Sequence, residues 1–132
     1  MKYIEKLRNS GLRPTKQRLQ ICEVLFNTER TFHFTINELE KRIKDKINNK
    51  ISLATIYNTV EAFTKAGYLK EILTSKSKSY YDTNIKSHHH FYDEATKELT
   101  DIDYNQVKLS KVPIPPKGKK IKNLEVVIRI QK

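Results

Sequence analysis

Residues 52–67 read SLATIYNTVEAFTKAG and contain the clearest structural signal in this chain. Ser52 is a favourable helix N-cap, because its hydroxyl can accept a hydrogen bond from an otherwise unpaired backbone N–H. Gly67 suits the end of the helix, because glycine tolerates a left-handed backbone. The spacing predicts a helix over 53–65, and its buried face is formed by Leu53, Ile56, Val60 and Phe63.

Three further helices are expected before residue 52. Thr35 and Glu38 have the spacing of a capping box, and an apolar stripe follows them up to Ile47. Thr15 is placed to cap an earlier helix, which is preceded by a short one over residues 2–9.

Two strands follow, over 68–73 and 79–83, joined by a polar and basic link. A helix, a turn, a second helix and a basic-tipped hairpin occur in the order that is typical of a winged helix-turn-helix. We therefore assign residues 1–84 to a winged-helix DNA-binding domain.

Residues 85–132 predict a second, smaller domain. Strands are expected over 87–93, 98–102 and 121–130, with a short helix over 104–109 that Asp103 would cap. Because so few elements bury little apolar surface, we expect this domain to pair with a second copy. The predicted fold class is α+β: an N-terminal winged helix-turn-helix followed by a small α/β dimerisation domain.

The charge balance favours a polyanionic partner. The chain has 26 Lys and Arg against 15 Asp and Glu, a net charge of +11. In a helix-turn-helix the second helix enters the major groove of double-stranded DNA, and nearby cations neutralise phosphates. The DNA-binding candidates are Arg13, Lys16, Ser52, Ala54, Thr55, Tyr57, Asn58, Lys76 and Lys78, with Thr59 at the edge of the set.

Three of the four histidines are consecutive: His88, His89 and His90. On a strand, His88 and His90 would point to one face and His89 to the opposite one. Two imidazoles on one face form half of a transition-metal site, and the third could serve a second site or a heme.

Several classes of protein are disfavoured. A single cysteine, Cys22, excludes an intramolecular disulfide and a Cys-based zinc cage. No apolar run approaches the roughly 20 residues of a membrane span, and residues 1–5 lack the apolar stretch of a signal peptide. We expect a cytoplasmic protein without membrane association.

Several motifs together resemble the ferric uptake regulator (Fur) superfamily, in order and over nearly the whole chain. Those motifs lie at residues 11–18 (GLRPTKQR), 33–39 (HFTINEL), 52–60 (SLATIYNTV), 88–91 (HHHF) and 99–102 (LTDI). The resemblance implies a dimeric, metal-dependent transcription regulator that binds a DNA operator. It also implies a regulatory site that takes ligands from both domains, and the matching residues are His33, Asp82, His88, His90 and Asp101. This mixed set of nitrogen and oxygen ligands suits Fe, Mn or Zn.

Two departures from the family pattern are informative. Many members hold a structural zinc with two Cys-x-x-Cys pairs, but Asp93 and Thr96 occupy the positions of the first pair, so no structural zinc held by cysteines is expected. These losses and the His-His-His-Phe run resemble the iron response regulator (Irr) branch, whose members bind heme through the histidine cluster. His88, His89 and His90 are thus candidate heme ligands. A Cys-Pro heme motif is missing, since Glu23 follows Cys22.

The main hypothesis is a repressor of iron or heme homeostasis that responds to a bound metal ion or heme. A manganese- or peroxide-responsive regulator of the same family is the alternative. A heme- or metal-binding protein without DNA contact would belong to another class. A small metalloenzyme using His88, His90 and Asp101 is disfavoured, because no separate acid, base or substrate pocket is apparent, and we assign no catalytic residue.

Overall fold

The computed structural model describes residues 2–73 and 79–132. Lys76 and Lys78, expected at the tip of the hairpin, lie outside the described residues. The chain divides into two compact units, Met1–Ile85 and Lys86–Lys132. None of the described helices is both long enough and apolar enough to cross a membrane.

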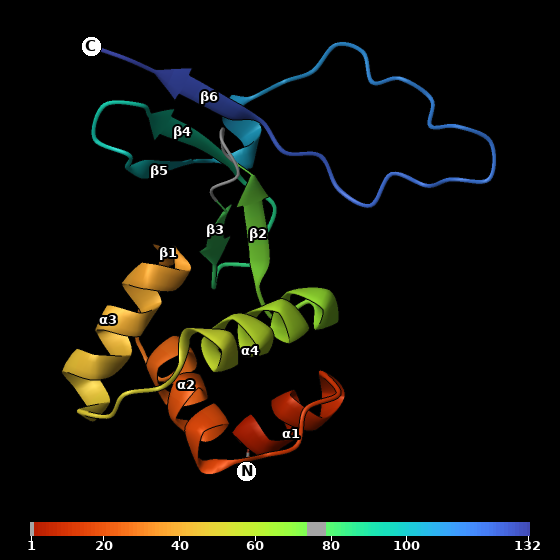
Figure 1. Cartoon of the computed structure of the whole chain (residues 1–132). Coiled ribbons are helices and arrows are strands. Elements are labelled where there is room, and N and C mark those ends of the chain that lie inside the picture. The colour runs from red at the N-terminus through yellow and green to blue at the C-terminus, as the bar shows by residue number, and fades with distance from the viewer. Residues whose placement is uncertain (1, 74–78) are drawn as a thin grey trace. The chain divides into compact units, whose positions relative to one another are not determined.

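Among its described residues, the first unit contains four helices (Figure 1): α1 (Lys2–Asn9), α2 (Lys16–Phe26), α3 (Ile36–Ile47) and α4 (Leu53–Ala66). The predicted caps are confirmed. The hydroxyls of Thr15, Thr35 and Ser52 each accept a hydrogen bond from the backbone N–H three residues on. Gly67 ends α4 with a φ of 90°, the left-handed conformation expected of it.

The apolar stripe of α4 was predicted correctly except at its start. Ile56, Val60 and Phe63 are buried in one core with residues of α1, α2 and α3, whereas Leu53 is 44% exposed. Leu53 is the first residue of the helix and points away from the core. Ile51, just before the cap, is buried instead. Ile51 precedes the cap and Ile56 is the fourth residue of the helix, and both belong to the same core. Apolar residues at these two positions commonly pack together.

A three-stranded antiparallel sheet completes this unit. Its strands are β1 (His33–Phe34), β2 (Lys70–Leu73) and β3 (Ser79–Asp82), in the order β1-β3-β2. Strands β2 and β3 follow the helix-turn-helix of α3 and α4, whereas β1 precedes α3 and adds a third strand beside β3. This is the architecture of a winged helix, as predicted.

The second unit contains the sheet β5-β4-β6, built from β4 (His89–Asp93), β5 (Leu99–Ile102) and β6 (Val127–Ile130). Strand β5 is antiparallel to β4, and β6 is parallel to it. The unit is therefore a small sheet with β6 at one edge.

Two predictions for this unit are wrong in extent. The expected helix over 104–109 is a single 3₁₀ turn, η1 (Tyr104–Gln106). Among the described residues the Asp103 side chain has no capping hydrogen bond, so the first turn lacks the support that a longer helix needs. The strand expected over 121–130 covers only 127–130. Because Val127 lies opposite His90, earlier residues extend beyond the start of β4 and have no strand to pair with there.

Candidate functional site

The exposed face of α4 presents most of the predicted DNA contacts. Ser52, Ala54 and Asn58 are exposed, and the Tyr57 side chain is 49% exposed. Thr55 is half-buried, and the Ser52 hydroxyl donates to its hydroxyl at 2.9 Å. Side chains that protrude from one face of a second helix are available for contact with base edges.

The predicted cations lie beside the start of that helix. Arg13, Lys16, Arg18 and Thr55 line one open hollow, which joins the beginning of α2 to the first turn of α4. The Arg18 guanidinium donates to the Arg13 carbonyl at 3.0 Å, which orders this corner. Arg13 and Lys16 therefore lie beside the first turn of α4 and its exposed face.

Thr59, at the edge of the predicted set, cannot contact DNA. Its side chain is fully buried, and its hydroxyl donates to the Thr55 carbonyl at 2.7 Å. Its position in the helical period lies between the apolar stripe and the exposed face. Packing in the tertiary structure places its side chain on the buried side.

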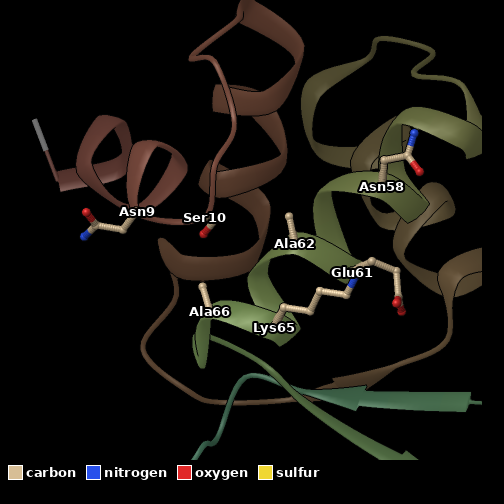
Figure 2. A pocket seen from close by; sticks show the side chains of 7 residues that line it. All are labelled: Asn9, Ser10, Asn58, Glu61, Ala62, Lys65 and Ala66. Atoms are coloured by element: carbon tan, nitrogen blue, oxygen red, sulfur yellow. The ribbon is translucent and has the colours of Figure 1, made fainter.

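Glu61 of α4 lies beside the exposed face that carries Asn58, and the sequence did not single it out. It lines a hollow between α4 and the end of α1, together with Asn58 and Lys65 (Figure 2). The Tyr81 hydroxyl donates to Glu61 Oε1 at 3.0 Å. Burial and this hydrogen bond raise the pKa of Tyr81, so the hydroxyl keeps its proton and holds the carboxylate. The only sequence signal was that Glu61 stands off the apolar stripe.

His33 and Asp82 are brought together within the first unit. They lie directly opposite each other on β1 and β3, which are paired antiparallel. One Asp82 oxygen, Oδ1, accepts a hydrogen bond from the Asn84 N–H at 2.8 Å, which fixes the carboxylate at the end of its strand. An imidazole and a carboxylate on neighbouring strands provide two ligands of the kinds that transition metals take.

His88, His90 and Asp101 converge within the second unit. The Nε2 atoms of His88 and His90 lie 3.5 Å and 3.3 Å from the same oxygen, Oδ1 of Asp101. The two imidazole centroids are 4.4 Å apart. The alternation predicted for the histidine run is confirmed, because His88 and His90 share this face.

The tautomer of His88 indicates what this cluster can hold. Nδ1 of His88 lies 2.6 Å from the Lys86 carbonyl, which can only accept, so Nδ1 bears a proton. A neutral ring then directs the lone pair of Nε2 toward the Asp101 carboxylate. Such an arrangement is favourable when a proton or a cation lies between the two atoms. A divalent metal fits the donor set, and a carbonyl bond to the distal nitrogen commonly orients a metal-binding histidine.

His89 points to the opposite face and is buried. Its Nδ1 accepts a hydrogen bond from the Val126 N–H at 2.9 Å, and its ring stacks on Tyr104 with centroids 5.2 Å apart. The side chain is thus committed to the interior of the second unit.

Asp93 has a structural role. In many members of the family that this chain resembles, a zinc-binding cysteine occupies this position. The Asp93 carboxylate accepts hydrogen bonds from the N–H groups of Thr96 and Ala95, which lower its pKa and close the turn between β4 and β5.

Comparisons with known proteins agree on one family. A sequence model described as the ferric uptake regulator family matches residues 9–129. The peroxide-responsive repressor PerR of Staphylococcus epidermidis is 35% identical over 104 residues, which cover 79% of this chain and 67% of that protein. The ferric uptake regulator of Pseudomonas aeruginosa, solved with manganese, has a TM-score of 0.72 at 22% identity, covering 100% of this chain and 98% of that one. The peroxide stress regulator of Campylobacter jejuni has a TM-score of 0.60 at 21% identity, covering 97% and 90%.

Proposed function

The chain belongs to the ferric uptake regulator family, and we propose on that basis that it is a dimeric, DNA-binding transcription repressor that responds to a bound divalent metal. The observation that carries the proposal is the convergence of His88, His90 and Asp101 in a chain whose other unit is a winged helix. No catalytic step is proposed. A cytoplasmic location, where operator DNA is accessible, is part of the proposal.

The DNA-binding part of the proposal rests on the face of α4. Tyr57 and Asn58 protrude from its middle, and Arg13 and Lys16 flank its start. Asn can pair with adenine and the Tyr ring can contact a thymine methyl, whereas the two cations would hold phosphates. Because the net charge is +11, binding to a polyanion is also favoured at long range.

The sensing part of the proposal joins the ligand pairs of the two units. We propose that one ion takes His33 and Asp82 from the first unit and His88, His90 and Asp101 from the second. A metal that binds both units would favour one arrangement of the chain over others, because only that arrangement satisfies all five ligands. Metal binding would in this way control how the two recognition helices of a dimer meet an operator.

The second copy is proposed from the composition of the small unit. Among the described residues of the second unit, the buried apolar side chains are those of Tyr92, Leu99 and Ile102. Strand β6 is at the edge of its sheet, and Ile128 and Ile130 on it are each 39% exposed. An apolar edge strand favours pairing with another chain.

Mn, Fe and Zn all suit the proposed ligands. A peroxide-responsive regulator is the second candidate, favoured by the 35% identity to a peroxide-responsive repressor and by the match of all five ligand types. Membership of the iron response regulator branch, with heme as the ligand, remains a prediction from the histidine run. His89 gives it little support, because its side chain is 2% exposed and Nδ1 already accepts from Val126.

Operator binding separates a regulator from a metal or heme buffer. An operator selected from a random duplex library would be titrated with the wild type, Arg13→Ala/Tyr57→Ala, and the control Lys117→Ala, which changes an exposed lysine of the second unit. We expect the double variant to lose at least tenfold in affinity, since two contacts at about 1 kcal/mol or more each are removed. Its metal content should stay at the wild-type level. Unchanged DNA affinity in the double variant would refute the DNA-binding face.

The ligand is identified by elemental analysis and heme titration of the purified chain. His88→Ala/His90→Ala should abolish metal-dependent operator binding while circular dichroism shows a folded protein. Lost metal with no heme absorbance would support the divalent ion, and a heme band that disappears in this variant would support the heme alternative. Metal stoichiometry equal to that of the wild type would overturn the proposed site.

A further inference from the structure

We propose that His89 is a positioning residue, which fastens the C-terminal strand to β4 and so holds the metal-binding face of that strand in place. This inference rests on the proposed function, in which His88 and His90 are metal ligands. It concerns the one histidine of the run that the proposed site does not use.

His89 and His90 both form hydrogen bonds with one residue, Val126, and we call this pair of bonds the clamp. The Val126 N–H donates to Nδ1 of His89 at 2.9 Å, and the Val126 carbonyl accepts from the His90 N–H at 3.1 Å. Both backbone polar groups of Val126 are therefore bound by consecutive histidines of β4. Val126 immediately precedes β6, so the clamp sets where β6 begins to pair with β4.

The hydrogen bond also defines the state of the ring. A backbone N–H can only donate, so Nδ1 of His89 accepts and the ring is not protonated there. The ring stacks on Tyr104 at an interplanar angle of 19°, which ties η1 to the same strand. One buried side chain thus connects β4, η1 and the start of β6.

The connection to the metal site follows from the alternation of side chains along a strand. His89 anchors one face of β4, while His88 and His90 converge on Asp101 at the other. The backbone of His90 is bonded to the same residue that His89 holds. If Val126 is released, the peptide of His90 loses a fixed partner, and its imidazole is no longer held to one position relative to Asp101. Groups that orient a ligand in this indirect way commonly change metal affinity 10–100-fold.

Three substitutions in the whole 132-residue chain separate the effect of the hydrogen bond from that of the ring. His89→Asn places an amide oxygen where Nδ1 stands and keeps the acceptor. His89→Phe keeps a ring to stack on Tyr104 but removes the acceptor, and leaves the half-buried Val126 N–H without its partner. His89→Gln keeps an amide but carries its oxygen one bond too far. The readouts are the Kd for Mn²⁺ by calorimetry, and hydrogen exchange of the Val126 amide by NMR.

We expect His89→Phe and His89→Gln to bind Mn²⁺ at least tenfold more weakly than the wild type, with an unchanged stoichiometry and faster exchange at Val126. His89→Asn should stay within about threefold of the wild type. If His89→Phe does not fold, the contrast between His89→Asn and His89→Gln decides. Equal Mn²⁺ affinity in all variants, or equal loss in Asn and Gln, would overturn this inference alone. A wild-type chain that binds no divalent metal would overturn the proposed function as well.

Discussion

At the scale of single residues, three adjacent histidines have different surroundings. His88 and His90 face Asp101, whereas His89 is buried against Tyr104 and Val126. The alternation follows from strand geometry and was predictable. The partner of His89 was not, because Val126 lies 37 residues further along the chain. Glu61 was missed for the same reason, since Tyr81, which holds it, belongs to a different element.

Cys22 is a residue whose chemistry can be predicted from its burial. It lies in the helical core, and burial raises the pKa of its thiol to about 12. The reactive thiolate is therefore scarce at neutral pH. We expect thiol reagents to label the folded protein at pH 7.5 at least 100-fold more slowly than the unfolded protein, and hydrogen peroxide to leave Cys22 reduced.

The raised pKa of Cys22 also sets how folding stability changes with pH. Because the folded state favours the neutral thiol, the stability from Cys22 is present below the unfolded pKa, near 9.0. It is lost as the pH rises toward 12. The labelling prediction for Cys22 is checked by mass spectrometry, which would measure the labelling rates of folded and unfolded protein. Equal rates would contradict it.

At the scale of elements, helix ends were predicted well and strand ends less well. The caps at Thr15, Thr35 and Ser52 depend on a side chain and an N–H three residues away. The extent of β6 depends on where β4 begins, and β4 is distant in sequence. The helix expected over 104–109 shrank to one 3₁₀ turn, because Asp103 provides no side-chain cap among the described residues.

The capping box of α3 gives a testable number. The Thr35 hydroxyl accepts from the Glu38 N–H at 3.2 Å, and Glu38 Oε1 accepts from the Thr35 N–H at 2.8 Å. Thr35→Ala removes the first bond and should lower the free energy of unfolding by about 1 kcal/mol. Thr35→Ser keeps the hydroxyl and should lose less than half of that.

Urea unfolding followed by far-ultraviolet circular dichroism is a suitable measurement, because all the described α-helices belong to the first unit. An alanine variant as stable as the serine variant would show that the capping bond contributes nothing.

At the scale of the whole molecule, the charge of +11 predicts strongly salt-dependent DNA binding. Arg13→Gln with Lys16→Gln should reduce the slope of log K against log salt by about 0.9 for each phosphate that is no longer neutralised. The matched control is Lys111→Gln with Lys117→Gln, which removes the same charge from exposed residues of the second unit. Fluorescence anisotropy of a labelled operator at several salt concentrations would give the slopes. Equal slopes in both double variants would assign the effect to net charge rather than to cations near α4.

Local patterns were sufficient for the described helices of the first unit and for the winged-helix architecture. Both depend on neighbours within a turn of helix or a few residues of strand, where spacing alone carries the information. Spacing also placed His88 and His90 on one face of a strand, but the full set of proposed metal ligands came from the resemblance to a family. Tertiary packing placed His33 opposite Asp82, buried Thr59, left Leu53 exposed and gave His89 its partner. Those outcomes depend on which distant segments share a core and a strand register, and residue spacing within one segment does not specify that.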